Sequence, residues 1–284
     1  MENAILLLEK WAALLRYDTI RMISNANSGH PGGALSAADI ITALFFQEMK
    51  IRPEEPTWPD RDRFILSKGH ACPVYYAALA RRGFFPVSEL KTLRQAGSRL
   101  HGHPKLVTPG VDMTSGSLGQ GLSIGAGMAM AGKMDGRDYR VFVMLGCGEL
   151  NEGQNYEAIM AAYHFKLSNL TAIVDYNGLQ FDGRLEDVLN PGSLVRRWEG
   201  FNWKVISIDG HSMAEILAAF ETVRNEKDLP CVIIARTVKG KGVNMMEDDY
   251  LWHSLMNNQA LTEFCTKRRK ELENADEFYA RRLW

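Results

Sequence analysis

The hydrophobic positions of the chain fall into short continuous runs separated by longer helical patterns. The runs cover residues 63–67, 140–145, 170–175, 204–208 and 231–235, and their apolar residues follow one another without a regular polar alternation. Continuous apolar runs are typical of parallel strands that are covered on both faces. We therefore expect an α/β fold, in which a parallel sheet with right-handed crossovers is flanked by helices.

Apolar residues at helical spacing predict the remaining elements. The expected helices cover residues 4–24, 37–49, 70–82, 119–134, 151–167 and 213–225, and a charged terminal helix covers 258–275. Ser36 is the expected N-cap of the second helix. Turn-rich loops are expected at residues 24–33, 97–117 and 237–252. The segment 119–134 is rich in Gly, Ala and Met, which favours close packing against another helix.

Composition places the chain among ordinary globular proteins. It has 284 residues, 46% of them hydrophobic, and its 33 Lys and Arg against 34 Asp and Glu give a net charge of −1. A general nucleic-acid binder would carry a basic excess, so we expect no nucleic-acid partner. Neither an internal repeat nor a linker divides the sequence, and one domain spanning residues 1–284 is the simplest organisation.

Nothing in the sequence favours export or insertion into a membrane. The first apolar run, residues 4–8, is shorter than the roughly 7–15 residues of a secretory signal. The uncharged stretch 113–132 is too rich in Gly, Ser, Thr and Gln for a membrane span. The four cysteines lie far apart, which favours free thiols in a reducing compartment. We expect a cytoplasmic protein with no membrane partner.

Two polar turns follow neighbouring strands of the predicted sheet. Gly146-Cys147-Gly148 comes after one strand and leads into a helix, and residues 176–179 follow the next strand. The carboxyl ends of parallel strands open on one edge, where glycines and a helix N-terminus offer backbone N–H groups to an anion such as a diphosphate. A cation bridging both turns to a phosphate is geometrically reasonable. Taken alone, the Gly-x-Gly turn is explained equally well as a tight strand–helix connection.

Histidines gather in the predicted loops. His30, His101, His103 and His253 lie in Gly- and Pro-rich loops, and His70 starts a helix after a strand. A lone loop histidine is usually solvated, but several in loops that are costly to order favour a polar pocket.

Several segments together resemble the transketolase family. They are SGHPG (28–32), DRFILSKGH (62–70), TSGSLGQG (114–121), GCGELNEG (146–153), VDYNGLQ (174–180), KGKG (239–242) and WH (252–253). Their order and spacing match the family over nearly the whole chain. The match is to the N-terminal, diphosphate-binding half of a full transketolase, so the chain resembles the N-terminal subunit of a split transketolase.

The resemblance implies a thiamine diphosphate-binding fold and assigns residues to the cofactor. The implied cofactor-binding set is His70, Gly116, Ser117, Leu118, Gly146, Cys147, Gly148, Glu152, Asn177, Leu179, Lys239 and His253. In the family, Mg²⁺ or Ca²⁺ is held by an Asp, an Asn and a backbone carbonyl, which correspond to Cys147, Asn177 and the carbonyl of Leu179. His30, His103 and again His253 would face the sugar as catalytic hydrogen-bond donors or proton shuttles.

The implied reaction is the transfer of a two-carbon ketol unit from a ketose or its phosphate to an aldose or its phosphate. In the family, the glutamate that activates the aminopyrimidine and the groups that grip the sugar phosphate come from pyrimidine-binding and C-terminal domains. The resemblance does not cover those domains. It therefore implies a C-terminal partner subunit, an α2β2 assembly, and no activity of this chain alone.

Cys147 is the main departure from the family pattern. Mg²⁺ and Ca²⁺ select oxygen ligands, and a thiol at its usual pKa of about 8.5 is mostly protonated at neutral pH. Three alternatives remain open: weakened but retained metal and cofactor binding, a softer ion such as Mn²⁺ or Zn²⁺, or a catalytically inactive chain. The retained histidines and Asn177 favour the first. Glu149 is either a replacement ligand or a favourable first-turn charge.

Two smaller departures from the family pattern also occur. Gly33 stands where the family commonly has a hydroxyl residue, and Ser254 replaces a glycine that often follows the loop histidine. A non-catalytic scaffold or regulatory subunit is the second hypothesis for the whole chain. A dinucleotide fingerprint at residues 119–121 is disfavoured, because no strand precedes it.

Overall fold

One five-stranded parallel sheet forms the centre of the protein. The computed structural model describes residues 2–254, 259 and 263, and the strands run in the order β1-β2-β3-β5-β4. The strands are β1 (Arg63–Leu66), β2 (Val141–Gly146), β3 (Leu170–Tyr176), β4 (Lys204–Asp209) and β5 (Cys231–Arg236), all paired in parallel. The predicted α/β fold is confirmed, and every predicted strand end agrees with the structure to within one residue.

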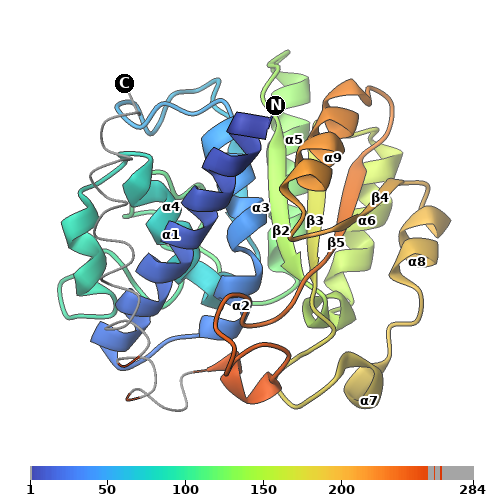
Figure 1. Ribbon diagram of the computed structural model, residues 1–284. Helices are drawn as coiled ribbons and strands as arrows, with labels where there is room; N and C mark the ends of the chain where they lie inside the picture. Colours follow the sequence, from blue (N-terminus) through green and yellow to red (C-terminus); the bar gives the residue numbers. More distant parts are fainter. Residues whose placement is uncertain (1, 255–258, 260–262, 264–284) are drawn as a thin grey trace.

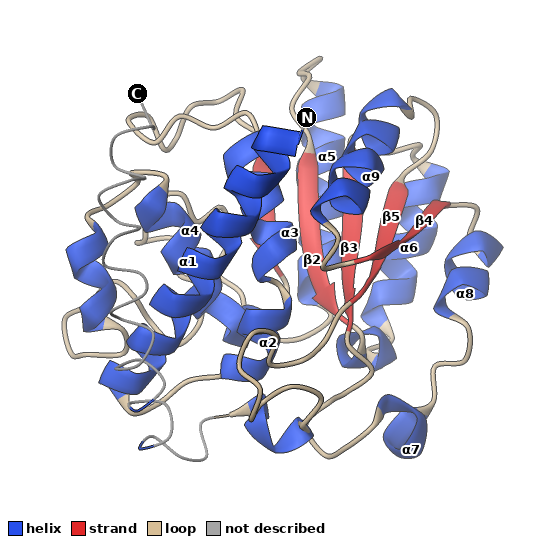
Figure 2. Cartoon of the chain, in the orientation of Figure 1, coloured by secondary structure: helices blue, strands red, loops and turns tan. Residues whose placement is uncertain are grey.

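Helices cover both faces of the sheet (Figure 1, Figure 2). One layer contains α1 (Glu2–Ala26), α2 (Pro31–Ser36), α3 (Ala38–Ala43), α4 (Cys72–Arg81) and α9 (Met213–Asn225). The other contains α5 (Gln120–Met134), α6 (Gln154–His164), α7 (Leu185–Leu189) and α8 (Leu194–Gly200).

The two layers explain why the strands are apolar throughout. Successive side chains of a strand point to opposite faces. Phe142 and Met144 of β2 therefore join the core beneath α1, α3 and α9, whereas Val143 and Leu145 join the core beneath α5 and α6. Because both faces are covered, each position of the strand is buried and an apolar residue is favoured at each.

The second predicted helix is divided in the structure. The sequence pattern predicts one helix over residues 37–49, but α2 begins earlier at Pro31 and a π-helical turn, Leu44–Glu48, follows α3. Proline suits the first position of a helix because its missing N–H needs no partner there. The prediction that Ser36 is an N-cap is wrong. Ser36 ends α2, and its Oγ donates a hydrogen bond to Asp175 Oδ2 at 2.6 Å, a long-range partner that local spacing does not reveal.

Other elements lie partly outside the predictions. The short helices α7 and α8 were not predicted, and the predicted terminal helix 258–275 lies outside the described residues. Cys72, Cys147 and Cys231 are buried and free, as expected, and Cys265 is also outside the described residues. Within the described part of the chain, no helix is both long and apolar enough to cross a membrane.

The glycines of α5 pack on the sheet. A Cβ atom at Gly125 would lie 2.4 Å from Val143 Cγ2, and one at Gly121 would lie 2.3 Å from Ser67 Oγ. Helix α5 also lies beside α6, but its closest glycine contacts are with strand residues and their extensions. The prediction that this helix packs against another helix is confirmed by α6, but the closest contacts of Gly121 and Gly125 are with the sheet and the residue that follows β1.

A matched pair of substitutions tests this packing. Gly125→Ala forces a methyl group into Val143 and should lower the free energy of unfolding by about 1–3 kcal/mol. Gly127→Ala, two residues along the same helix, meets nothing within 4 Å and should raise it by up to about 1 kcal/mol through helix propensity. Urea unfolding of both variants measures the difference. Equal effects of the two substitutions would contradict the close contact with β2.

Candidate functional site

The candidate site is a cavity of about 370 Å³ at the carboxyl edge of the sheet. It lies where the turn after β2, the turn after β3 and the loop after β5 come together. Its lining includes most residues that the resemblance assigned to the cofactor, namely His70, Leu118, Gly146, Cys147, Gly148, Glu152, Asn177, Leu179, Lys239 and His253. His30, His103, Gly116 and Ser117 do not line it, and His101 is exposed.

A buried ion pair lies beneath the cavity. Lys68 Nζ, just after β1, is 2.5 Å from Asp175 Oδ2 in β3, and the two side chains are 2% and 0% exposed. Asp175 also accepts hydrogen bonds from Ser36, Thr237 and Asn177. Burial alone would raise the pKa of Asp175, but the Lys68 ammonium and these hydrogen bonds hold it below its ordinary value. Sequence reasoning missed this pair, although both residues lie in the family-like segments.

The three predicted metal-ligand positions converge. Cys147 Sγ lies 3.8 Å from Asn177 Oδ1 and 4.0 Å from the carbonyl oxygen of Leu179. Burial, with the nearby Asp175 carboxylate, raises the pKa of the Cys147 thiol, so the thiol is neutral near pH 7. The set then contains one neutral sulfur and two neutral oxygens. It fits Mg²⁺ and Ca²⁺ poorly, because these ions favour carboxylate oxygens.

Glu149 is not a replacement ligand. Its Oε1 accepts hydrogen bonds from the Gly119 amide at 2.9 Å and from the Ser67 hydroxyl, and its Oε2 accepts one from the Gly146 amide at 3.0 Å. Burial raises the pKa of this carboxyl group. Both oxygens are therefore used to join the turn after β2 to the start of α5. Within the described residues, no group of three or more His, Cys, Asp or Glu side chains is placed to hold a metal ion.

Four predicted histidines form one cluster beside the cavity. The ring centroids of His70 and His253 lie 5.0 Å apart. The ring centroid of His30 lies 5.3 Å from that of His70, 5.5 Å from that of His253 and 6.5 Å from that of His103. Burial is the main cause that lowers the pKa of each: to about 4 for His30, to about 3 for His253, and below the ordinary value for the other two. At neutral pH all four rings are uncharged and can donate or accept hydrogen bonds. The Nδ1 atom of His30 is buried and has no hydrogen-bond partner among the residues that the structure describes.

Two predicted glycines have a steric role here. Gly116 has a φ of +154°, and a Cβ atom there would lie 3.2 Å from Cδ2 of His103. A Cβ atom at Gly148 would lie 3.0 Å from Cβ of Gln180, so this glycine lets the turns after β2 and β3 approach each other. Gly146 is less crowded, because a Cβ atom there would meet Lys68 and Glu149 at 3.8–3.9 Å, which are ordinary van der Waals distances.

Lys239 is held in the cavity wall by the loop after β5. Its side chain is buried, and burial lowers its pKa to about 8. The preceding residue, Val238, donates its amide hydrogen to His211 Nε2 at 2.8 Å, and His211 Nδ1 lies 2.7 Å from Asp39 Oδ2. Since Nε2 accepts, Nδ1 carries the proton that Asp39 accepts. Sequence reasoning did not assign His211, because its partners are distant in the sequence.

Together these groups fit the diphosphate end of a cofactor. The cavity offers a buried ammonium and neutral imidazoles, which are groups that bind phosphate oxygens through donated hydrogen bonds. The donor set suits an anion, even though the metal-ligand set beside it lacks a carboxylate.

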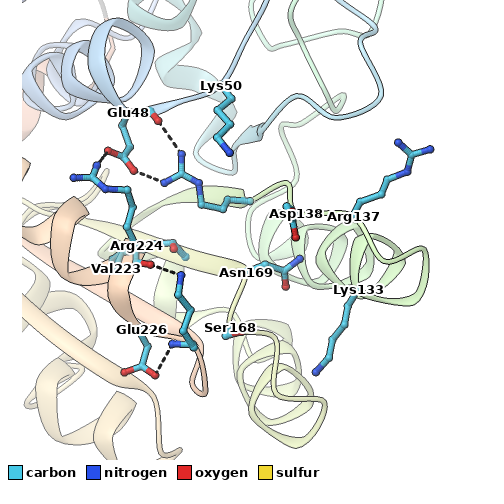
Figure 3. A pocket seen from close by; sticks show the side chains of 13 residues that line it. Glu48, Lys50, Lys133, Arg137, Asp138, Ser168, Asn169, Val223, Arg224 and Glu226 are labelled. Carbon is cyan, nitrogen blue, oxygen red and sulfur yellow. Dashed lines mark hydrogen bonds and ion pairs between the residues drawn. The ribbon is translucent and has the colours of Figure 1, made fainter.

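A second cavity, of about 520 Å³, lies at the opposite edge of the sheet (Figure 3). Its buried carboxylate, Glu48, is bonded to both Arg140 and Arg224. Arg140 is also paired with Asp62 at 2.7 Å. Because these charges neutralise one another and α/β sheets bind ligands at their carboxyl edge, the first cavity is the better candidate.

The buried ion pair makes a testable contribution to stability. Lys68→Met leaves the Asp175 carboxylate buried without its cation, which should lower the free energy of unfolding by about 3–5 kcal/mol. The double variant with Asp175→Asn removes both charges and should recover part of that loss.

The same pair also makes stability depend on pH. Because the pKa of Asp175 is lowered in the fold, its contribution to the free energy of unfolding is present above the unfolded pKa of about 4 and is lost as the pH falls further. Urea unfolding of the double variant should therefore depend less on pH below about 4 than that of the wild type. A single variant as stable as the wild type would contradict this role.

Comparisons with known proteins identify similar sequences and folds. A family model described as the transketolase thiamine diphosphate binding domain matches residues 8–272. A subunit of the apulose-4-phosphate transketolase of Phocaeicola vulgatus is 42% identical over 234 residues, which cover 82% of this chain and 83% of that protein. The 6-deoxy-6-sulfo-D-fructose transketolase subunit SqwG of Clostridium sp. is 42% identical over 257 residues, which cover 90% and 92%.

Longer transketolases match over part of their length. Human transketolase is 42% identical over 247 residues, which cover 87% of this chain but 39% of that protein. A crystal structure of transketolase from Campylobacter jejuni has a TM-score of 0.86 and 35% identity, and the match covers 94% of this chain and 42% of that one. The chain thus spans less than half the length of these two proteins. By sequence and by fold, the chain belongs to the transketolase family and corresponds to its thiamine diphosphate binding domain.

Proposed function

We propose that this chain is the cofactor-binding subunit of a two-chain transketolase, which transfers a two-carbon ketol unit from a ketose to an aldose. The observation that carries the proposal is the convergence of the family's cofactor positions on one cavity at the carboxyl edge of the sheet. The relatives named as subunits, which this chain matches over more than four fifths of their length, support a separate partner chain.

Thiamine diphosphate would supply the electron sink for breaking the carbon–carbon bond. The diphosphate would contact His70, His253 and Lys239 above the turn of Gly146 and Gly148. The aminopyrimidine end would lie near Gly116, Ser117 and Leu118 at the cavity mouth, with Glu152 facing the partner. A divalent metal, if bound, would be held by Asn177 and the Leu179 carbonyl, with Cys147 at the family's aspartate position.

The sugar would meet the histidine cluster. His30, His103 and His253 are uncharged near pH 7, so each ring can donate one hydrogen bond and accept another at a sugar hydroxyl or carbonyl. The partnerless Nδ1 of His30 supports a polar ligand at this position. A Cβ atom at Gly33 would meet only His70 and Lys68, at 3.7 and 3.8 Å, so the glycine leaves room where the family commonly has a hydroxyl group.

The mouth of the cavity supports a partner. Four partly exposed apolar residues line the cavity: Leu118, Phe181, Val188 and Leu189. Their exposed fractions are 37%, 62%, 43% and 58%, in that order. Exposed apolar side chains grouped around a ligand cavity are typical of a surface that another protein covers. We propose that the pyrimidine-binding and C-terminal domains of a partner subunit cover this mouth in an α2β2 assembly, and that residues 1–284 form one domain.

We further propose sugar phosphates as substrates and the cytoplasm as the location. The two subunit relatives are named for different sugars, which supports the reaction type more than any one substrate. The three described cysteines are free, as expected in a reducing compartment.

A non-catalytic scaffold is the second candidate, and the observation that favours it is the neutral thiol at the metal position. Such a subunit would pair with its partner but would neither bind the cofactor nor turn over.

Reconstitution distinguishes the two functions. The chain mixed with its partner subunit, thiamine diphosphate and a divalent metal should transfer ketol units in a coupled aldose-release assay, whereas the chain alone should show no transfer. No turnover with Mg²⁺, Ca²⁺ or Mn²⁺, in a complex shown to form by gel filtration, would favour the scaffold.

The partner surface has its own test. Leu189→Asp places a charge on the apolar mouth and should weaken partner binding by at least about tenfold, because truncated or charged interface anchors commonly cost about 2 kcal/mol or more. Leu6→Asp on α1 is the matched control, since Leu6 is 51% exposed and does not line the cavity. Biolayer interferometry with the immobilised partner measures both. Equal affinities of the two variants would contradict the proposed surface.

A further inference from the structure

The corner where the family holds a metal is closed by the protein's own contacts. Cys147 is 1% exposed, and its Sγ lies within sulfur hydrogen-bonding distance of both Asn177 Oδ1 and the Leu179 carbonyl. Asn177 Oδ1 also accepts a hydrogen bond from the Leu179 amide at 3.1 Å. A hard cation here would have to displace the thiol proton and would still find no carboxylate. The corner therefore supplies neither the charge nor the ligand type that Mg²⁺ or Ca²⁺ requires.

The same cavity contains a buried cation without an acidic partner. Among its lining residues, Lys68 is bonded to Asp175 at 2.5 Å and to the Gly33 carbonyl at 2.7 Å. Lys239 has no such partner within the described residues: its Nζ lies 3.3 Å from His253 Nδ1 and 3.4 Å from the carbonyl oxygen of Gln180. Both neighbours are neutral. The carboxylates of Asp175 and Asp249 act on Lys239 only from beyond ion-pair distance. A buried ammonium without an ion-pair partner in contact is costly, and an anion in the cavity would offset that cost.

The position of Lys239 is fixed by its surroundings. A Cβ atom at Gly32 would lie 3.0 Å from both Cγ and Cε of Lys239, so the glycine makes room for the lysine side chain. The Gly240 amide donates to the Gly32 carbonyl at 3.0 Å, and the Asp248 amide donates to the Lys239 carbonyl at 3.0 Å. The ammonium is therefore held at the cavity wall and is not a solvated surface charge that happens to lie nearby.

We infer that this chain holds the diphosphate without a hard metal ion, with the thiol group of Cys147 closing the metal position and Lys239 supplying the charge. The inference rests on the proposed function, because it concerns the same cofactor site. Lys239 supplies the positive charge that faces the diphosphate. The thiol of Cys147 can donate its one proton to either Asn177 Oδ1 or the Leu179 carbonyl, the two oxygens that a metal would otherwise ligate. The chain consequently binds thiamine diphosphate equally well with and without Mg²⁺ or Ca²⁺.

Calorimetric titration tests this directly. Thiamine diphosphate is titrated into the metal-stripped complex of the chain with its partner subunit in excess EDTA, and in parallel with Mg²⁺, Ca²⁺ or Mn²⁺. The wild-type dissociation constant should agree within about threefold across all conditions, a change well below the roughly 10–100-fold effects of losing a metal-site partner. In Cys147→Asp, Mg²⁺ should tighten binding by at least about tenfold. Cys147→Ser is the matched control: it introduces a hard oxygen without a charge and should remain insensitive to Mg²⁺.

A second pair of variants tests the lysine. Lys239→Met should weaken binding in EDTA by at least about tenfold, the effect of losing a charge-assisted contact, whereas Lys239→Arg should keep most of the affinity. Unfolding curves of both variants establish that the fold is intact. In the Cys147→Asp background with Mg²⁺, the effect of Lys239→Met should be smaller, because the metal then supplies the counter-charge.

The outcomes separate the inference from the proposed function. A wild type that binds at least about tenfold more tightly with any of the three metals would overturn the inference but leave the cofactor-binding role intact. An unchanged affinity of Lys239→Met would also overturn it. No binding by the wild type or by Cys147→Asp in any condition would overturn the proposed function, and the inference with it.

Discussion

The site depends on the ion pair between Lys68 and Asp175. Two buried charges are stable only when their remaining hydrogen-bonding groups are satisfied. Here Gly33 accepts from the lysine, while Ser36, Asn177 and Thr237 donate to the aspartate. These partners come from α2, the end of β3 and the loop after β5. The pair therefore ties three segments that are far apart in the sequence to one point under the cavity floor, and each segment carries a group of the proposed cofactor site.

The Asp175 carboxylate orients groups of two different loops. Asn177 is oriented by its bond to Asp175, and its oxygen then meets Cys147 and the Leu179 amide. Thr237 is bonded to the same carboxylate and begins the loop after β5. The next residue of that loop, Val238, donates its amide hydrogen to His211, and Lys239 follows it. The polar wall is thus rigid before any ligand arrives, which is the condition for binding a charged group at little reorganisation cost. The apolar mouth, in contrast, carries exposed side chains, which the proposed partner subunit would cover.

The sequence predicted those features that depend on local pattern or on the family motifs. The strands follow from burial on both faces, and most of the cofactor positions line one cavity. The sequence did not predict the features that depend on contacts between residues far apart in the chain. Ser36 has the character of an N-cap, yet its hydroxyl is held by Asp175. Gly125 suggests helix packing, yet Val143 of the sheet occupies the space. Glu149 suggested a ligand, but its oxygens are used by the Gly119 and Gly146 amides. In each case the residue type indicated a specific contact, but the sequence did not indicate which residue would make that contact.

The thiol at position 147 bears on the choice between an enzyme and a scaffold. A diphosphate needs a counter-charge in a buried site, and either a metal or a side chain can provide it. If the chain had no anion to bind, Lys239 would be a buried ammonium whose hydrogen-bond partners within the described residues are both neutral and whose nearest carboxylates, Asp175 and Asp249, lie beyond ion-pair distance. Such a charge is costly to bury. His30, with a partnerless buried nitrogen, has a similar cost. A scaffold gains nothing from either group, whereas a cofactor-binding subunit uses both. The buried Lys239 and His30 therefore support the proposed cofactor-binding subunit over the scaffold, even with a thiol at position 147.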